Sequence, residues 1–250
     1  MPTVRAPLVL GLLVGLMGCS GAPTAPDRLA ASPTSRAAQA AVAVGSARPV
    51  VVPQVGPYRR TGRDVFRSST GPVTAARLGA SHRAGCPVAV ADLRLVGVVH
   101  WGLDMRTRRG ELVVHRTAAA DVVAVFRRLH AARFPLAEVV TAEQYAADDD
   151  LLMAANATSA YNCRRTTGGT GWSEHAYGTA LDLNPVQNPY VRGTTVEPPA
   201  GRAYLDRRDV RPGMVVAGDA VVRAFAAVGW QWGGEFRTLK DYQHFSETGR

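Results

Sequence analysis

Residues 171–185, GWSEHAYGTALDLNP, place a histidine and an aspartate on either side of a glycine. In TALDLNP the side chains alternate with the period of a β-strand, so its two leucines would face a core while Asp182 faces the other side. Gly178 permits a turn or a close backbone approach before this strand, and such a turn can bring His175 beside Asp182. The segment therefore predicts half of a metal site, with an ordinary turn and strand as the alternative for this pair alone.

The C-terminal segment DYQHF supplies a third candidate ligand. Asp241 and His244 lie three positions apart, and Phe245 offers an apolar side chain to the core. A catalytic zinc site has three protein ligands of nitrogen and oxygen type and one open position. One of these two residues can complete the set begun by His175 and Asp182, while the other acts as a base. His244 as ligand and Asp241 as base fits this division, because a carboxylate that does not bind the metal can accept a proton from water.

Together these segments resemble the zinc D-alanyl-D-alanine carboxypeptidase family. That family includes vancomycin-resistance carboxypeptidases and phage endolysin L-alanyl-D-glutamate peptidases, and it shares its fold with the hedgehog signalling domain. Its pattern is S-x-H-x-x-G-x-A-x-D, followed near the C-terminus by D/E-x-x-H, often after W-G-G. The matching positions are Ser173, His175, Gly178, Ala180, Asp182, Trp232, Gly233, Gly234, Asp241 and His244. The resemblance covers most of residues 86–246 and departs from the pattern at Glu235-Phe236, where relatives often have Asp-Trp.

The resemblance implies a Zn²⁺ ion held by His175, Asp182 and His244, with Asp241 as the catalytic base. It also implies hydrolysis of peptidoglycan stem peptides, with D-Ala-D-Ala carboxypeptidase activity as the favoured reaction. An endopeptidase that cuts within or between stem peptides has the same zinc centre and is the close alternative. A zinc-stabilised wall-binding module without turnover is a third interpretation, which the presence of Asp241 argues against.

The resemblance further implies residues that contact the substrate. An arginine about ten residues before the first histidine contacts substrate and the developing oxyanion; Arg164 matches best, and Arg165 is the rival. Ser173 is implied near the substrate carboxylate. Trp232 belongs either to the core or to the wall of the cleft, where it would contact substrate. The acidic run at residues 148–150 is interpreted as a solvated surface.

Strand and helix patterns are mixed without a βαβ rhythm, so the sequence predicts an α+β domain over residues 75–250. We expect a small, mainly antiparallel sheet flanked by helices, in keeping with the hedgehog-like zinc fold of the family. Residues 92–104 and 108–116 are β-rich around a turn and predict a hairpin. Thr117 or Asp121 would cap the helix that follows.

The first residues predict export. Arg5 precedes a short apolar run over residues 7–17, which is too short to span a bilayer that needs ~20 apolar residues. The run suits a signal peptide over residues 1–18. It ends in LMGC, which resembles the bacterial lipobox and predicts lipidation of Cys19. An ordinary secretory signal with a chance cysteine is the alternative.

Residues 19–74 are rich in Ala, Pro and Ser over much of their length and predict a flexible stalk behind the lipidated Cys19. We expect a bacterial membrane lipoprotein, monomeric and facing the cell wall. The chain has 29 Lys and Arg against 20 Asp and Glu, which favours anionic wall polymers or lipid headgroups as partners. Nucleic acid is not expected, because no basic stripe carries interleaved aromatic residues. Cys86 and Cys163 are expected to form a disulfide; two zinc thiolates are the alternative, but C-x-x-C spacing is missing.

Overall fold

The computed structural model describes residues 65–167 and 169–249. The predicted signal peptide, Cys19 and the first part of the predicted stalk lie outside these residues. The helices are α1 (Ala75–Leu78), α2 (Ala119–Ala131), α3 (Asp149–Ala154) and α4 (Ala220–Ala226). The strands are β1 (Ser68–Pro72), β2 (Leu93–Trp101), β3 (Thr107–His115), β4 (Glu138–Val139), β5 (Ala157–Thr158), β6 (Ala180–Asp182), β7 (Tyr190–Arg192), β8 (Thr195–Glu197), β9 (Gln231–Trp232), β10 (Lys240–Asp241) and β11 (His244–Ser246). Short 3-10 helices are η1 (Gly79–Ser81), η2 (Val90–Asp92), η3 (Ala142–Tyr145), η4 (Glu174–Tyr177), η5 (Pro199–Tyr204) and η6 (Gly233–Glu235).

The strands form small sheets, and the α+β prediction is confirmed. β1-β2-β3, β6-β11-β9 and β10-β7-β8 are antiparallel, whereas β4 and β5 pair in parallel. The predicted hairpin is present as β2 and β3, which pair from Leu93 opposite His115 to Trp101 opposite Thr107. Within the described part of the chain, no helix is long and apolar enough to cross a bilayer.

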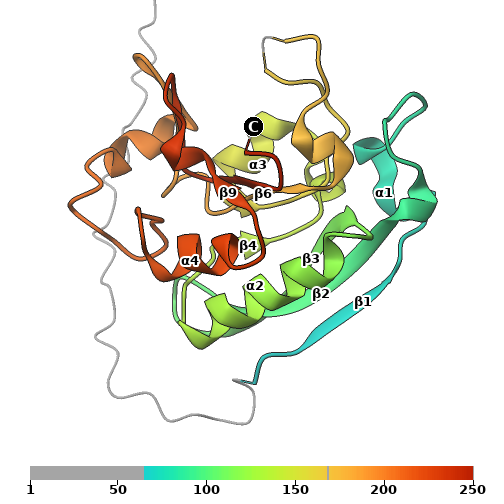
Figure 1. Cartoon of the computed structure of the whole chain (residues 1–250), viewed down its shortest axis with the longest axis horizontal. Coiled ribbons are helices and arrows are strands. Elements are labelled where there is room, and N and C mark those ends of the chain that lie inside the picture. The colour runs from blue at the N-terminus through green and yellow to red at the C-terminus, as the bar shows by residue number, and fades with distance from the viewer. Residues whose placement is uncertain (1–64, 168, 250) are drawn as a thin grey trace, which may run out of the picture. The chain divides into compact units, whose positions relative to one another are not determined.

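Helix α2 covers one face of the β2–β3 hairpin (Figure 1). Val122, Phe126 and Leu129 recur at helical spacing and are all buried in the main core with residues of α4 and β11. The predicted cap of this helix is wrong. Ala118 occupies the N-cap position without a side-chain hydrogen bond, and the Thr117 hydroxyl lies 2.7 Å from the His115 ring instead.

The predicted boundary between stalk and domain also needs correction. Residues 68–72 form β1, which pairs with β2 along its whole length, and Val73 is buried. The strand SSTGP is mostly exposed and is held by main-chain hydrogen bonds at a sheet edge. The side chains of this strand do not alternate between apolar and polar. Hydrophobic periodicity in the sequence therefore could not distinguish the strand from a polar linker.

The predicted disulfide between Cys86 and Cys163 is present, with the two Cα atoms 5.9 Å apart. Cys163 is buried with Leu78 and Tyr161 in a second apolar cluster. The bond therefore ties the loop after η1 to the segment that leads into the SEHAYG motif.

Candidate metal centre

Two neighbouring strands place two of the predicted ligands directly opposite one another. β6 and β11 pair antiparallel, with His244 opposite Asp182 and Phe245 opposite Leu181. Leu181 and Phe245 are fully buried in the main core. Since successive side chains of a strand point to opposite faces, Asp182 and His244 share the face turned away from that core. Main-chain hydrogen bonds with Ser159 hold the other edge of β6 at Asp182.

The third predicted ligand is carried by a short 3-10 helix. His175 lies in η4, where the Ser173 hydroxyl oxygen accepts a hydrogen bond from the His175 amide at 3.3 Å. Gly178 ends this turn with φ of +72°, a conformation that favours glycine. A Cβ at position 178 would lie 2.6 Å from the main-chain nitrogen of His115 in β3. The glycine thus allows η4 to lie directly against β3, which fixes where the His175 ring enters the site.

The three side chains converge into one buried cluster. His175 Nε2 lies 3.1 Å from Asp182 Oδ2, and His244 Nδ1 lies 3.1 Å from Asp182 Oδ1. The two ring nitrogens are 3.3 Å apart, and the three potential ligand atoms all lie within 4.8 Å of one another.

The donor set fits a zinc ion. His175 Nδ1 lies 2.7 Å from the carbonyl oxygen of Ala160, which can only accept, so Nδ1 carries a hydrogen. A neutral ring in this orientation has the lone pair of Nε2 directed toward Asp182. A carboxylate is likewise only an acceptor, so the centre of the cluster requires a cation or an added proton. Two imidazoles and one carboxylate are a known zinc ligand set, and a ring N–H bonded to a carbonyl is the usual support for a ligating histidine.

The electrostatics of the cluster favour an ionised carboxylate. Burial alone would raise the pKa of Asp182, but the charges and hydrogen bonds of His175 and His244 outweigh burial and hold that pKa well below its usual range. The side chain of Asp182 is therefore an anion in the folded protein, as a metal ligand must be.

Asp241, the predicted base, lies in β10 and keeps one oxygen without a partner. Its Oδ1 atom is buried and has no hydrogen-bond partner within the described residues. Burial raises the pKa of Asp241 to about 6, although the nearby charge of His244 acts in the opposite direction. Gly233 of the W-G-G segment allows β10 to approach, because a Cβ there would lie 2.5 Å from the Asp241 carbonyl oxygen. A carboxylate with a free oxygen and a raised pKa has the properties of a general base.

The structure separates the two arginines that the sequence left as rivals. The Arg165 guanidinium stacks 3.7 Å from the ring centre of Trp172 and donates to the Thr170 carbonyl oxygen, so it is engaged within the 166–171 loop. Arg164 instead forms an ion pair with Asp149, whose charge interacts with those of Asp182 and His175. This placement favours Arg164 over Arg165 as the arginine expected to contact the substrate.

Two interpretations of the sequence are corrected here. Trp232 is 6% exposed and packs in the main core, and its indole N–H donates to the Tyr242 carbonyl oxygen at 2.8 Å, so a substrate contact from its ring is not supported.

The acidic run at residues 148–150 is more than a solvated surface, because Asp148 caps α3 and Asp149 pairs with Arg164 at 2.8 Å. Sequence reasoning missed Asp149, since nothing in a run of three aspartates marks the one that turns inward.

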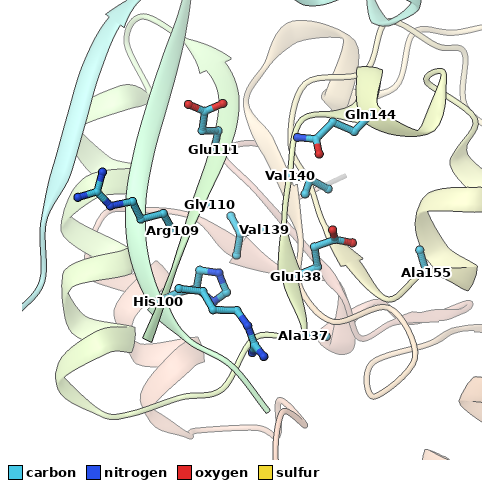
Figure 2. Close-up of a pocket in the computed structure, with 11 residues that line it drawn as sticks. His100, Arg109, Gly110, Glu111, Ala137, Glu138, Val139, Val140, Gln144 and Ala155 are labelled. Carbon is cyan, nitrogen blue, oxygen red and sulfur yellow. The ribbon is translucent and has the colours of Figure 1, made fainter. Parts of the chain in front are cut away.

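A cavity of about 630 Å³ lies elsewhere, between β3 and β4 (Figure 2). His100, Glu111 and Glu138 are among its lining residues, and none of the predicted catalytic or ligand residues is. Among the described residues, the one group of three or more potential metal ligands is His175, Asp182 and His244. We therefore assign the candidate catalytic site to that cluster and not to the cavity.

Comparison with known proteins agrees with this geometry. A family model described as D-alanyl-D-alanine carboxypeptidase matches residues 166–247, which include both histidines of the cluster, Asp182 and Asp241. No curated protein and no solved structure matches the chain. The resemblance expected from the SEHAYGTALD and DYQHF segments is confirmed, since residues 166–247 are similar to the D-alanyl-D-alanine carboxypeptidase family.

Proposed function

We propose that the protein is a zinc-dependent carboxypeptidase that removes the terminal D-alanine from peptidoglycan stem peptides. The observation that carries this proposal is the buried cluster of His175, Asp182 and His244, within the segment that matches the carboxypeptidase family model. Beside it, an oxygen of Asp241 has no hydrogen-bond partner among the described residues. The three clustered residues would hold the ion. A bound zinc ion acts as a Lewis acid that polarises a carbonyl group and makes water acidic near neutral pH.

Three other residues transfer the proton, stabilise the developing negative charge and bind the substrate. Asp241 accepts a proton as water attacks the scissile carbonyl and later returns it to the leaving amine. Arg164 donates N–H groups to the substrate oxygen on which negative charge develops. Ser173 already accepts a hydrogen bond from the His175 amide, and its hydroxyl hydrogen stays available to donate to the substrate carboxylate.

The location of the protein is part of the same proposal. A signal peptide over residues 1–18, lipidation at Cys19 and a stalk behind it would hold a monomeric domain at the membrane, within reach of the wall. Metabolic labelling with a fatty acid, compared between the wild-type chain and Cys19→Ala, tests this. An unlabelled wild-type chain would contradict lipidation.

The test of activity uses purified muropeptides that carry pentapeptide stems. We expect mass spectrometry to show loss of one terminal alanine, and we expect a zinc chelator to stop it. Cleavage within the stem or at a cross-link would identify an endopeptidase instead. Binding to the wall without any cleavage would indicate a non-catalytic module.

A further inference from the structure

The guanidinium of Arg164 has one end fixed and one end free. Its Nη2 atom lies 2.8 Å from Asp149 Oδ2, and this ion pair is partly buried on both sides. Its Nη1 atom makes only a long contact of 3.4 Å with the Arg165 carbonyl oxygen. Its Nε atom is buried and has no hydrogen-bond partner in the described part of the chain. Burial of an N–H group without an acceptor costs free energy. A native protein that keeps such a donor calls for an explanation, and donation to an oxygen atom of a bound ligand is one.

The position of Asp149 in this ion pair is fixed by its helix and by the loop before it. Asp149 lies in the first turn of α3, and Asp148 caps this helix by accepting a hydrogen bond from the Leu151 amide. The loop before α3 is tied to the metal cluster through Asn162, whose side chain donates to the Ala147 carbonyl oxygen and whose amide donates to the His175 carbonyl oxygen. Asp149 therefore has a fixed position relative to the cluster.

The backbone of Arg164 is fixed independently. The preceding residue, Cys163, forms the disulfide with Cys86, and the Arg164 carbonyl oxygen accepts a hydrogen bond from the Ser173 amide. An arginine side chain still has several rotatable bonds beyond its Cα atom, so a fixed backbone does not by itself determine where the guanidinium points. The contact with Asp149 supplies that missing constraint.

We propose that Asp149 is a positioning residue of the peptidase, which clamps one end of the Arg164 guanidinium and so aims its free N–H groups at the substrate oxygen. This inference rests on the proposed function, because it assigns Asp149 a part in the same reaction. A partly buried ion pair with one charge-assisted hydrogen bond fixes the orientation of the arginine, and orientation of a group that stabilises the transition state affects kcat more than it affects folding.

The test compares Asp149→Asn with Asp150→Asn in the purified full chain. Both changes remove one negative charge from the first turn of α3, but Asp150 is exposed, so it controls for the effect on the helix. With a synthetic peptide ending in L-Lys-D-Ala-D-Ala, we expect Asp149→Asn to lower kcat/KM about tenfold to a hundredfold, mainly through kcat. Asp150→Asn should stay within about twofold of the wild-type value, and Asp149→Glu should recover part of the lost rate.

A double-mutant cycle with Arg164→Ala distinguishes positioning from other effects. Because Asp149 acts through Arg164, adding Asp149→Asn to Arg164→Ala should change kcat/KM by less than about twofold. Equal losses in both backgrounds would overturn the inference, as would unchanged activity of Asp149→Asn or a fall in its zinc content that accounts for the lost rate. If the wild-type chain itself cleaves no such peptide, the proposed function fails and the inference falls with it, so the two failures are distinguishable.

Discussion

Replacing Asp241 with asparagine should stabilise the metal-free protein. Burial raises the pKa of this carboxyl group from its ordinary value of 3.8 to about 6 in the fold. The folded state then binds the proton more tightly than the unfolded state does, so stability is lost as pH rises from the lower pKa to the higher. A difference of roughly two pKa units at 1.36 kcal/mol per unit gives a cost of about 3 kcal/mol at neutral pH. Asp241→Asn keeps the shape of the side chain and removes this cost.

The assay is urea unfolding of the chelated wild-type chain and of Asp241→Asn, each at about pH 7.5 and about pH 4. The variant should be more stable by about 2–3 kcal/mol at the higher pH. The difference should shrink to less than about 1 kcal/mol at the lower pH, where the wild-type carboxyl group is protonated in the folded state and about half protonated in the unfolded state. A stability gap that is absent, or that is the same at both pH values, would refute the reasoning.

The same variant also tests whether Asp241 acts as the general base or as a metal ligand. If Asp241 is the base and not a ligand, Asp241→Asn should keep its zinc and lose ~100- to 10,000-fold in turnover. In the wild-type enzyme, activity should fall as pH drops through the pKa of Asp241, because a protonated carboxyl group accepts no proton. A bound cation favours the ionised form, so this fall should lie below pH 6. Loss of zinc from Asp241→Asn would instead identify Asp241 as a ligand.

Three further outcomes are expected. His175→Ala should lose bound zinc, measured by elemental analysis, whereas His100→Ala should keep it; full occupancy in His175→Ala would contradict the ligand assignment. Replacing Cys86 and Cys163 together by alanine opens a loop of 77 residues, which should lower the free energy of unfolding by about 4 kcal/mol. Gly178→Ala should cost roughly 1–3 kcal/mol and reduce turnover, because position 178 has a φ of +72° and lies against β3; wild-type stability would show that η4 can shift freely.

The sequence predicted the cluster well because strand alternation and spacing carry the relevant information. Alternation around Asp182 assigned the leucines of TALDLNP to the core, and Leu181 is indeed fully buried. Phe245 was expected to offer its apolar side chain to the core next to the candidate ligand His244, and it is buried in the main core. Spacing alone could not show that β6 and β11 pair with these two candidate ligands directly opposite each other, since residues 182 and 244 are far apart in the chain.

The parts that sequence patterns missed depend on contacts between distant segments. Strand β1 is held mainly by main-chain hydrogen bonds to β2, which leave little trace in side-chain polarity. The choice between Arg164 and Arg165 depends on which side chain meets Asp149 and which stacks on Trp172. These partners come from other elements or from the far side of a loop, and residue type alone does not reveal them.

The core and the candidate site are specified by the same few residues. In β11, Phe245 stacks on Phe225 with ring centres 3.9 Å apart, while His244 on the opposite face joins the cluster with Asp182. A shift of this strand by one residue would place His244 in the core and Phe245 among the ligands, so burial of the aromatic ring sets the register that aligns the two ligands. The site also contains a group that opposes folding, since the Oδ1 atom of the half-buried Asp241 is shielded from solvent and has no hydrogen-bond partner among the described residues. Burial of the apolar face of β11 offsets that cost, and for this reason a strand of three residues can hold both a core position and a ligand position.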